Sequence, residues 1–218
     1  MFTIGRYGLL IASLFLFSNF DYKEANMAAI KLNQKCNDTI FLYFPLPDLV
    51  SNANNTTNSL DTFMNVWYSR MLSAMKEPIL TDYEGDAEIY RFTWLRSFHR
   101  PIMIRVEKSN NSIKLTAKEL NGRGGYQPGK LSNVITLRIS EYQWNLGVSM
   151  IKDLNFWNLG MDADARGFDG AEWIIEGSTR ENYHFTTAWS PGKTGNYGKY
   201  CLFLLNLSGI KVPQKEIY

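Results

Sequence analysis

Residues 90–106 read YRFTWLRSFHRPIMIRV, and large apolar side chains occupy every second position on either side of a break at Arg100-Pro101. A period of two is typical of β-strands, because successive side chains point to opposite faces of a sheet. The same alternation recurs over 113–117 and 134–139. We therefore expect one antiparallel sheet, whose helix-facing side carries Trp94, Ile104, Leu115 and Leu137.

Helix signals lie on both sides of these strands. Ser59 or Asn58 can cap a first helix, whose apolar stripe runs from Leu60 to Met75 and stops before Pro78. Ser140 and Gln143 form a capping-box pattern that opens a second helix, and a third is expected from about 197 to 207, ending at Gly209. Two further strands, at about 171–176 and 182–189, form a hairpin. Grouped strands without βαβ alternation predict an α+β domain, with an antiparallel sheet and helices packed on one face.

The N-terminus has the pattern of a secretory signal, in which Arg6 precedes the apolar run 8–17. We predict a signal peptide over residues 1–20, a poorly structured segment with an Asn-rich linker over 21–59, and a single domain over 60–218. This organisation predicts a periplasmic or secreted protein. The run is short for a membrane span, and the cleavage site is poor. Two alternatives therefore stay open. The apolar run is an uncleaved anchor, which would be the protein's only expected contact with the membrane, or translation starts at Met27.

Cys36 and Cys201 are the two cysteines of the chain. One bridge between them is compatible with an oxidising compartment. We predict instead that they are unpaired, because Cys201 lies in an apolar helix pattern and Cys36 lies in the poorly structured segment. No C-x-x-C spacing occurs, so the sequence predicts no cysteine-based zinc site.

The predicted hairpin contains the candidate catalytic groups Asp169, Glu172, Glu176 and His184. They belong to the pattern D-G-x-x-W-I-x-E-G at 169–177, followed by Tyr183-His184 and by W-S-P at 189–191. With W-Y-S at 67–69, YRFTWLR at 90–96 and G-G-Y-x-x-G-K-L at 124–131, this pattern resembles a group of bacterial exported proteins, many from Bacteroidetes-like organisms. No activity is assigned to that group. The resemblance implies a bacterial source and one compact domain, and it carries over no catalytic residue.

Strand parity argues against a catalytic pair in this hairpin. Glu172 and Glu176 share one strand face, and a turn of even length pairs Glu176 with Tyr183 and places His184 beside Ile175 on the other face. We expect both acids to face solvent and Trp173 to face the core. Alanine at Glu176 is then expected to change little. A hydrolase that uses Glu172, Glu176, Asp169 and His184 stays the alternative function. His99 is the second of the two histidines.

Two loops have the composition of ligand-binding loops but depart from the motifs. The loop 162–169 begins like a calcium loop, but Arg166 stands where an oxygen ligand is needed, and Trp173 replaces the closing glutamate. The glycine-rich loop 121–129 joins two strands and lacks the Lys-Ser/Thr of a phosphate loop. We interpret them as an acidic surface turn and a hairpin loop, and predict no metal and no cofactor.

Charge is unevenly distributed along the chain, although the net charge is only +2. On the outward side of the four predicted strands, alternate positions carry a basic stripe, which consists of Arg91, Arg105, Lys114, Lys118 and Arg138. A solvated face, relieved by Glu107 or by the acidic hairpin, is one interpretation. The other is a site for an anionic ligand or an acidic protein surface. Low net charge and export argue against nucleic acid. We predict an exported, non-catalytic binding protein that uses this stripe or the hairpin 169–191.

Overall fold

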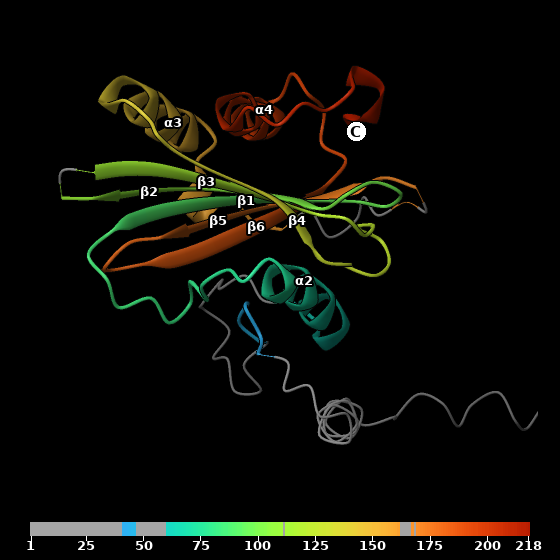
Figure 1. The fold of residues 1–218 in the computed structure, drawn as a ribbon. Helices are drawn as coiled ribbons and strands as arrows, with labels where there is room; N and C mark the ends of the chain where they lie inside the picture. Colours follow the sequence, from blue (N-terminus) through green and yellow to red (C-terminus); the bar gives the residue numbers. More distant parts are fainter. Residues whose placement is uncertain (1–40, 47–59, 111, 162–166, 168) are drawn as a thin grey trace, which may run out of the picture. The chain divides into compact units, whose positions relative to one another are not determined.

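The computed structural model describes residues 41–46, 60–110, 112–161, 167 and 169–218. At its centre lies one antiparallel six-stranded sheet in the order β4-β3-β2-β1-β5-β6 (Figure 1). Its strands are β1 (Glu88–Arg96), β2 (Ile102–Ser109), β3 (Ser112–Leu120), β4 (Leu131–Arg138), β5 (Ala171–Ser178) and β6 (Tyr183–Trp189). The first four form a meander, and the β5–β6 hairpin pairs with the other edge of β1.

Helices cover both faces of this sheet. They are α2 (Thr62–Ala74), α3 (Glu141–Asp153) and α4 (Asn196–Ser208), with short 3₁₀ turns η1 (Phe156–Asn158) and η2 (Gln214–Glu216). Figure 1 shows α3 and α4 on one face and α2 on the other. The α+β class with an antiparallel sheet is confirmed. The placement of all helices on one face was wrong, because Leu95, Met103 and Ile174 form a second apolar surface that α2 covers.

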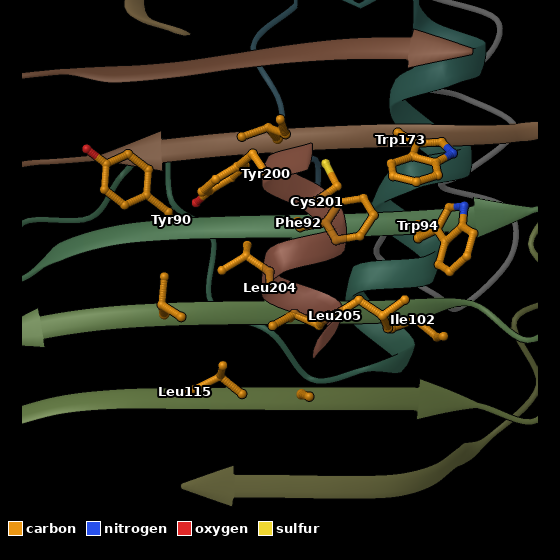
Figure 2. Packing of buried hydrophobic residues seen from close by; sticks show 14 of the residues in the cluster. Tyr90, Phe92, Trp94, Ile102, Leu115, Trp173, Tyr200, Cys201, Leu204 and Leu205 are labelled. Carbon is orange, nitrogen blue, oxygen red and sulfur yellow. The ribbon is translucent and has the colours of Figure 1, made fainter. Parts of the chain in front are cut away.

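The face toward α3 and α4 has the register that the sequence predicts. Trp94, Ile104 and Leu115 are fully buried there, and Leu137 packs against the same cluster from the edge strand. Figure 2 shows this packing, with Tyr200, Cys201, Leu204 and Leu205 of α4 lying over the strands. Trp94 and Trp173 are cross-strand partners with ring centroids 5.0 Å apart. Trp173 thus faces the core, as expected.

Helix α2 differs from the expectation in its N-terminal cap and in the face that it buries. Its N-cap is Asp61, not Ser59 or Asn58, and the Asp61 carboxylate accepts from the Met64 N–H at 2.9 Å. Phe63, one of the apolar residues of the stripe expected from Leu60 to Met75, is 77% exposed. The helix is rotated because its buried face also carries polar side chains, Asn65 and Ser69, that have partners in the segment 41–46.

Residues 41–46 belong to the domain, which therefore begins before residue 60. The Tyr43 N–H donates to the Ser69 hydroxyl at 2.9 Å, and the Asn65 amide donates to the Phe44 carbonyl at 2.7 Å. Tyr43 and Phe44 are buried beside α2. The prediction of a poorly structured segment up to residue 59 was thus wrong for this stretch, whose aromatic side chains close the apolar surface under α2.

The other helix ends confirm the local sequence signals. Ser140 and Gln143 make both hydrogen bonds of the capping box of α3. Helix α4 ends at Gly209, whose φ of 75° lies in the left-handed region that glycine tolerates. In the described part of the chain, no helix is both long enough and apolar enough to span a bilayer.

Several sequence predictions lie outside the described residues. They are the signal peptide over 1–20, Cys36, the Asn-rich stretch and most of the acidic loop 162–169. Cys201 is described, and it is a free thiol on the buried face of α4. Burial raises the pKa of this thiol well above its ordinary value, so the group is held as an unreactive thiol.

Candidate functional site

The two strand glutamates, Glu172 and Glu176, lie on the opposite face of the sheet from His184. Glu176 is opposite Phe185 and Gly177 is opposite His184, two residues away from the expected pairing but with the expected parity. His184 Nε2 lies 3.0 Å from the Leu159 carbonyl oxygen. Partial burial lowers the pKa of His184, although the hydrogen bond to Leu159 acts in the other direction. The pair that a hydrolase would need at this position is therefore not assembled.

Both hairpin glutamates are buried, which corrects their prediction as solvent-facing residues. Glu172 is 1% exposed and Glu176 is 0% exposed, because α2 covers their face of β5. Glu176 lies directly across from Arg91 of β1. Its two oxygens accept from Arg91 Nε and Nη2, each at 2.7 Å, in a bidentate pair.

The predicted basic stripe is mostly neutralised inside the protein. Glu77, which follows α2, accepts from Arg105 Nε at 2.8 Å and from Lys118 Nζ at 2.6 Å, and lies 3.5 Å from Arg91 Nη1. One carboxylate thus meets cations from β1, β2 and β3. We refer to Glu77, Arg91, Arg105, Lys118 and Glu176 as the buried ion network.

The C-terminal end of α2 explains why Glu77 reaches the sheet. The Lys76 N–H donates to the Ser73 carbonyl and the Glu77 N–H to the Leu72 carbonyl, which together form a Schellman motif. Lys76 has a φ of 53°, in the left-handed region. This turn reverses the chain, so Glu77 points back under the helix and not into solvent.

The buried ion network leaves little of the stripe for a ligand. Burial by itself lowers the pKa of the Arg91 guanidinium, but Glu176 and Glu77 outweigh that effect and raise it. Lys114 pairs with Glu107, and Arg138 alone of the stripe is an exposed residue. The stripe was therefore wrong as an open binding surface, because its central cations have acidic partners, Glu77 after α2 and Glu176 in β5, that the strand pattern does not reveal.

A different set of charged residues surrounds an open cleft at one end of the sheet, where the β1–β2 turn, the β3–β4 loop and the C-terminal segment meet. Its volume is about 360 Å³. It is lined by Arg96, Phe98, His99, Arg100, Glu119, Asn121, Gly122, Arg123, Lys211, Val212, Pro213 and Glu216. We call it the basic cleft, because its lining contains more cationic than acidic side chains.

Arg96 forms the inner wall of the basic cleft. Its side chain is 3% exposed and lies over the Trp94 ring, 4.6 Å from the centroid. Nη1 contacts Glu216 at 3.4 Å and Nη2 donates to the Arg100 carbonyl at 2.9 Å, while the buried Nε has no partner among the described residues. Burial lowers the pKa of Arg96, and Glu216 opposes this effect. The guanidinium thus lines the inner wall of the cleft with a carboxylate, that of Glu216, already beside it.

His99 links the C-terminal segment to the cleft wall. Its Nδ1 lies 2.7 Å from the Tyr218 hydroxyl, and its Nε2 lies 3.6 Å from a Glu216 oxygen. Partial burial raises the pKa of the Tyr218 phenol. The main-chain oxygen of Tyr218 accepts from the indoles of Trp94 and Trp173, at 3.3 and 2.9 Å. These contacts hold the segment against the domain and fix Glu216 in the cleft.

The outer part of the basic cleft carries the exposed cations Arg100, Arg123 and Lys211. Within the described ranges, no acidic side chain lies within 4.0 Å of their charged nitrogens. Cations that converge on a concave surface without internal partners attract anions from solution. This arrangement can bind an anionic group without any rearrangement of the buried ion network.

The glycine-rich loop contributes side chains to the cleft, not a cradle of backbone amides. The N–H groups of residues 121–126 each donate to a carbonyl within the loop or in the β1–β2 turn. These six amides are therefore not available to bind a phosphate in the way that phosphate loops bind nucleotides. Its interpretation as a hairpin loop between two strands is confirmed.

The basic cleft has no signature in the local sequence pattern. Arg96, Arg100 and Arg123 lie in the cation-rich part of the chain, but their joining depends on topology. In an antiparallel meander, the β1–β2 turn and the β3–β4 loop lie at the same end of the sheet. That rule could have predicted that these arginines lie close together. No local pattern places Lys211 and Glu216 beside them.

The described residues contain no group of three or more His, Cys, Asp or Glu side chains arranged to hold a metal ion. A second cavity, of about 10 Å³, lies between α3, α4 and the sheet. That volume is at the lower limit for one water molecule, so this cavity is a packing gap. The basic cleft is therefore the candidate site.

No family model matches the sequence, and comparison with curated proteins and with solved structures gave no match.

Proposed function

We propose that this protein is an exported, non-catalytic binding protein, and that its binding site is the basic cleft, which receives an anionic group of its ligand or partner. The proposal of export rests on the charged and apolar pattern of residues 6–17. The observation that carries the binding proposal is the set of three exposed cations, Arg100, Arg123 and Lys211, which have no acidic partner among the described residues and surround a cleft whose inner wall is Arg96.

The chemistry of the cleft favours binding over catalysis. A general acid or base must lie within hydrogen-bond reach of a substrate proton and have a group that orients it. The Nδ1 of His99 already bonds the Tyr218 hydroxyl, and that contact holds the C-terminal segment. The alternative of a hydrolase that uses Glu172, Glu176, Asp169 and His184 has less support, because the two glutamates and His184 lie on opposite sheet faces.

Citrate is a suitable probe, because it presents several carboxylates at once. We expect the full-length protein to bind citrate more weakly as ionic strength rises, since exposed charges are screened by salt. The double variant R100A/R123A should bind roughly tenfold more weakly, because each exposed charge pair contributes up to ~1 kcal/mol.

The matched control is Arg138→Ala, which removes an exposed cation from β4 at the far end of the sheet. It should leave citrate binding unchanged in isothermal titration calorimetry. Equal binding by the wild type and the double variant would show that the cleft is not the anion site.

A further inference from the structure

The rim of the basic cleft carries two exposed aromatic side chains. Phe98 is 46% exposed and Tyr126 is 61% exposed, and their ring centroids are 6.3 Å apart. Phe98 comes from the β1–β2 turn and Tyr126 from the β3–β4 loop. Exposed aromatic rings beside arginines have the composition of energetically dominant residues in protein interfaces.

This aromatic rim is held in place by the backbone beneath it. The Gly124 N–H donates to the His99 carbonyl at 3.0 Å, and the Gly125 N–H donates to the Ser97 carbonyl at 3.3 Å. The Trp67 indole from α2 donates to the Gly124 carbonyl at 2.8 Å. The loop and the turn are thus ordered before any partner arrives, which reduces the entropy lost on binding.

Glu216 shows which anion the inner wall accepts. A glutamate oxygen contacts Arg96 Nη1 at 3.4 Å and lies 3.6 Å from His99 Nε2. The inner wall is therefore shaped for the carboxylate of a glutamate side chain. The outer cations Arg100, Arg123 and Lys211 have no such partner within the described part of the chain, so they are available to carboxylates from elsewhere.

We propose that the basic cleft and its aromatic rim form a docking surface for an acidic segment of a partner protein. This inference rests on the proposed function, and it adds the class of partner. Carboxylates of the segment pair with Arg100, Arg123 and Lys211. An aromatic or large apolar side chain of the same segment packs on Phe98 and Tyr126. Charge complementarity and the carboxylate already seated in the cleft favour a polypeptide over a phosphate backbone.

The test uses fluorescence anisotropy with three labelled probes and the full-length protein. The first probe is a short glutamate-rich peptide with one central tryptophan, the second has alanine in place of that tryptophan, and the third is an oligothymidylate of equal charge. We expect the tryptophan peptide to bind at least about fivefold more tightly than either of the others, because an aromatic anchor dominates such contacts.

Variants distinguish the two parts of the proposal. F98A and Y126A should each weaken binding of the tryptophan peptide by about fivefold and leave the alanine peptide unaffected. R100A/R123A should weaken the binding of both peptides. Tyr142→Ala is the matched aromatic control, because Tyr142 is 75% exposed on α3, and the adjacent Glu141 pairs with Lys108 at the opposite end of the sheet.

Three results would overturn the inference. If both peptides bind equally and F98A and Y126A behave as the wild type, the aromatic rim has no role, although the anion site still stands. If oligothymidylate binds most tightly, the partner is a nucleic acid. If no probe and no citrate binds, the proposed function fails as well.

Discussion

Replacing Glu176 with alanine should destabilise the protein by about 3–5 kcal/mol, the usual cost of removing one partner from a buried ion pair. Arg91 is 0% exposed and would lose both bonds of 2.7 Å to Glu176. Glu77, 3.5 Å from Arg91 Nη1, also binds Arg105 and Lys118, so it compensates only in part. The loss would be a large share of the ~5–15 kcal/mol that stabilises a typical domain.

Urea unfolding, followed by tryptophan fluorescence and by far-ultraviolet circular dichroism, measures this effect. Glu181→Ala is the matched control, because this acid is exposed in the same hairpin, and its removal should change stability by no more than about 0.5 kcal/mol. The double variant R91M/E176M should recover most of the loss, since apolar residues of similar volume often replace buried ion pairs at little cost. A loss of stability below about 1 kcal/mol for E176A would refute the reasoning, because it would mean that water screens the ion pair between Arg91 and Glu176.

Three further predictions concern the core and its titratable groups. Trp173→Ala should cost about 3–5 kcal/mol in urea unfolding, because it leaves a large cavity beside Trp94, and a loss below about 1 kcal/mol would contradict the packing. His184 has a lowered pKa in the folded protein, so its contribution to stability is complete above the unfolded pKa of about 6.5 and is lost as pH falls below that value. His184→Gln should therefore reduce the pH dependence of the free energy of unfolding between about pH 7 and pH 5. An unchanged pH dependence would exclude this role for His184. In a Cys36→Ser background, Cys201 should react with iodoacetamide slowly in the native state and rapidly in urea, and fast native labelling would show that the thiol is accessible.

The sheet was predictable because its signal is local. Apolar side chains at alternate positions fix which face of a strand is buried, and Trp94, Ile104 and Leu115 follow that rule. Parity alone also separated Glu176 from His184, although the turn length was off by two residues. These inferences need only the spacing between residues in one strand or one hairpin.

The second apolar surface was the main feature that alternation did not reveal. The same face of β1 carries Arg91, Thr93 and Leu95, which together look like a solvent-facing pattern. Arg91 is buried because Glu176 and Glu77 come from distant parts of the chain. A charged side chain in a strand gives no sign of a partner that the tertiary fold supplies.

The basic cleft was missed for a related reason. Its residues come from a turn, a loop and the C-terminal segment, none of which has a periodic pattern. The meander brings Arg100 and Arg123 to one end of the sheet. Lys211 and Glu216 reach that end only because the Tyr218 main chain and hydroxyl bind two indoles and His99.

The strand order also affects how the chain can fold while it is being made. Strand β1 pairs with β2 soon after both emerge, but its other edge waits for β5, and Glu176 follows Arg91 by 85 residues. At the usual rate of synthesis, this delay lasts roughly 4–17 s. During that interval β1 is an exposed edge that could template pairing with another chain. We expect a hydrated Arg91 in the middle of that edge to oppose such pairing, so the residue that later needs Glu176 should first hinder aggregation of the unfinished chain.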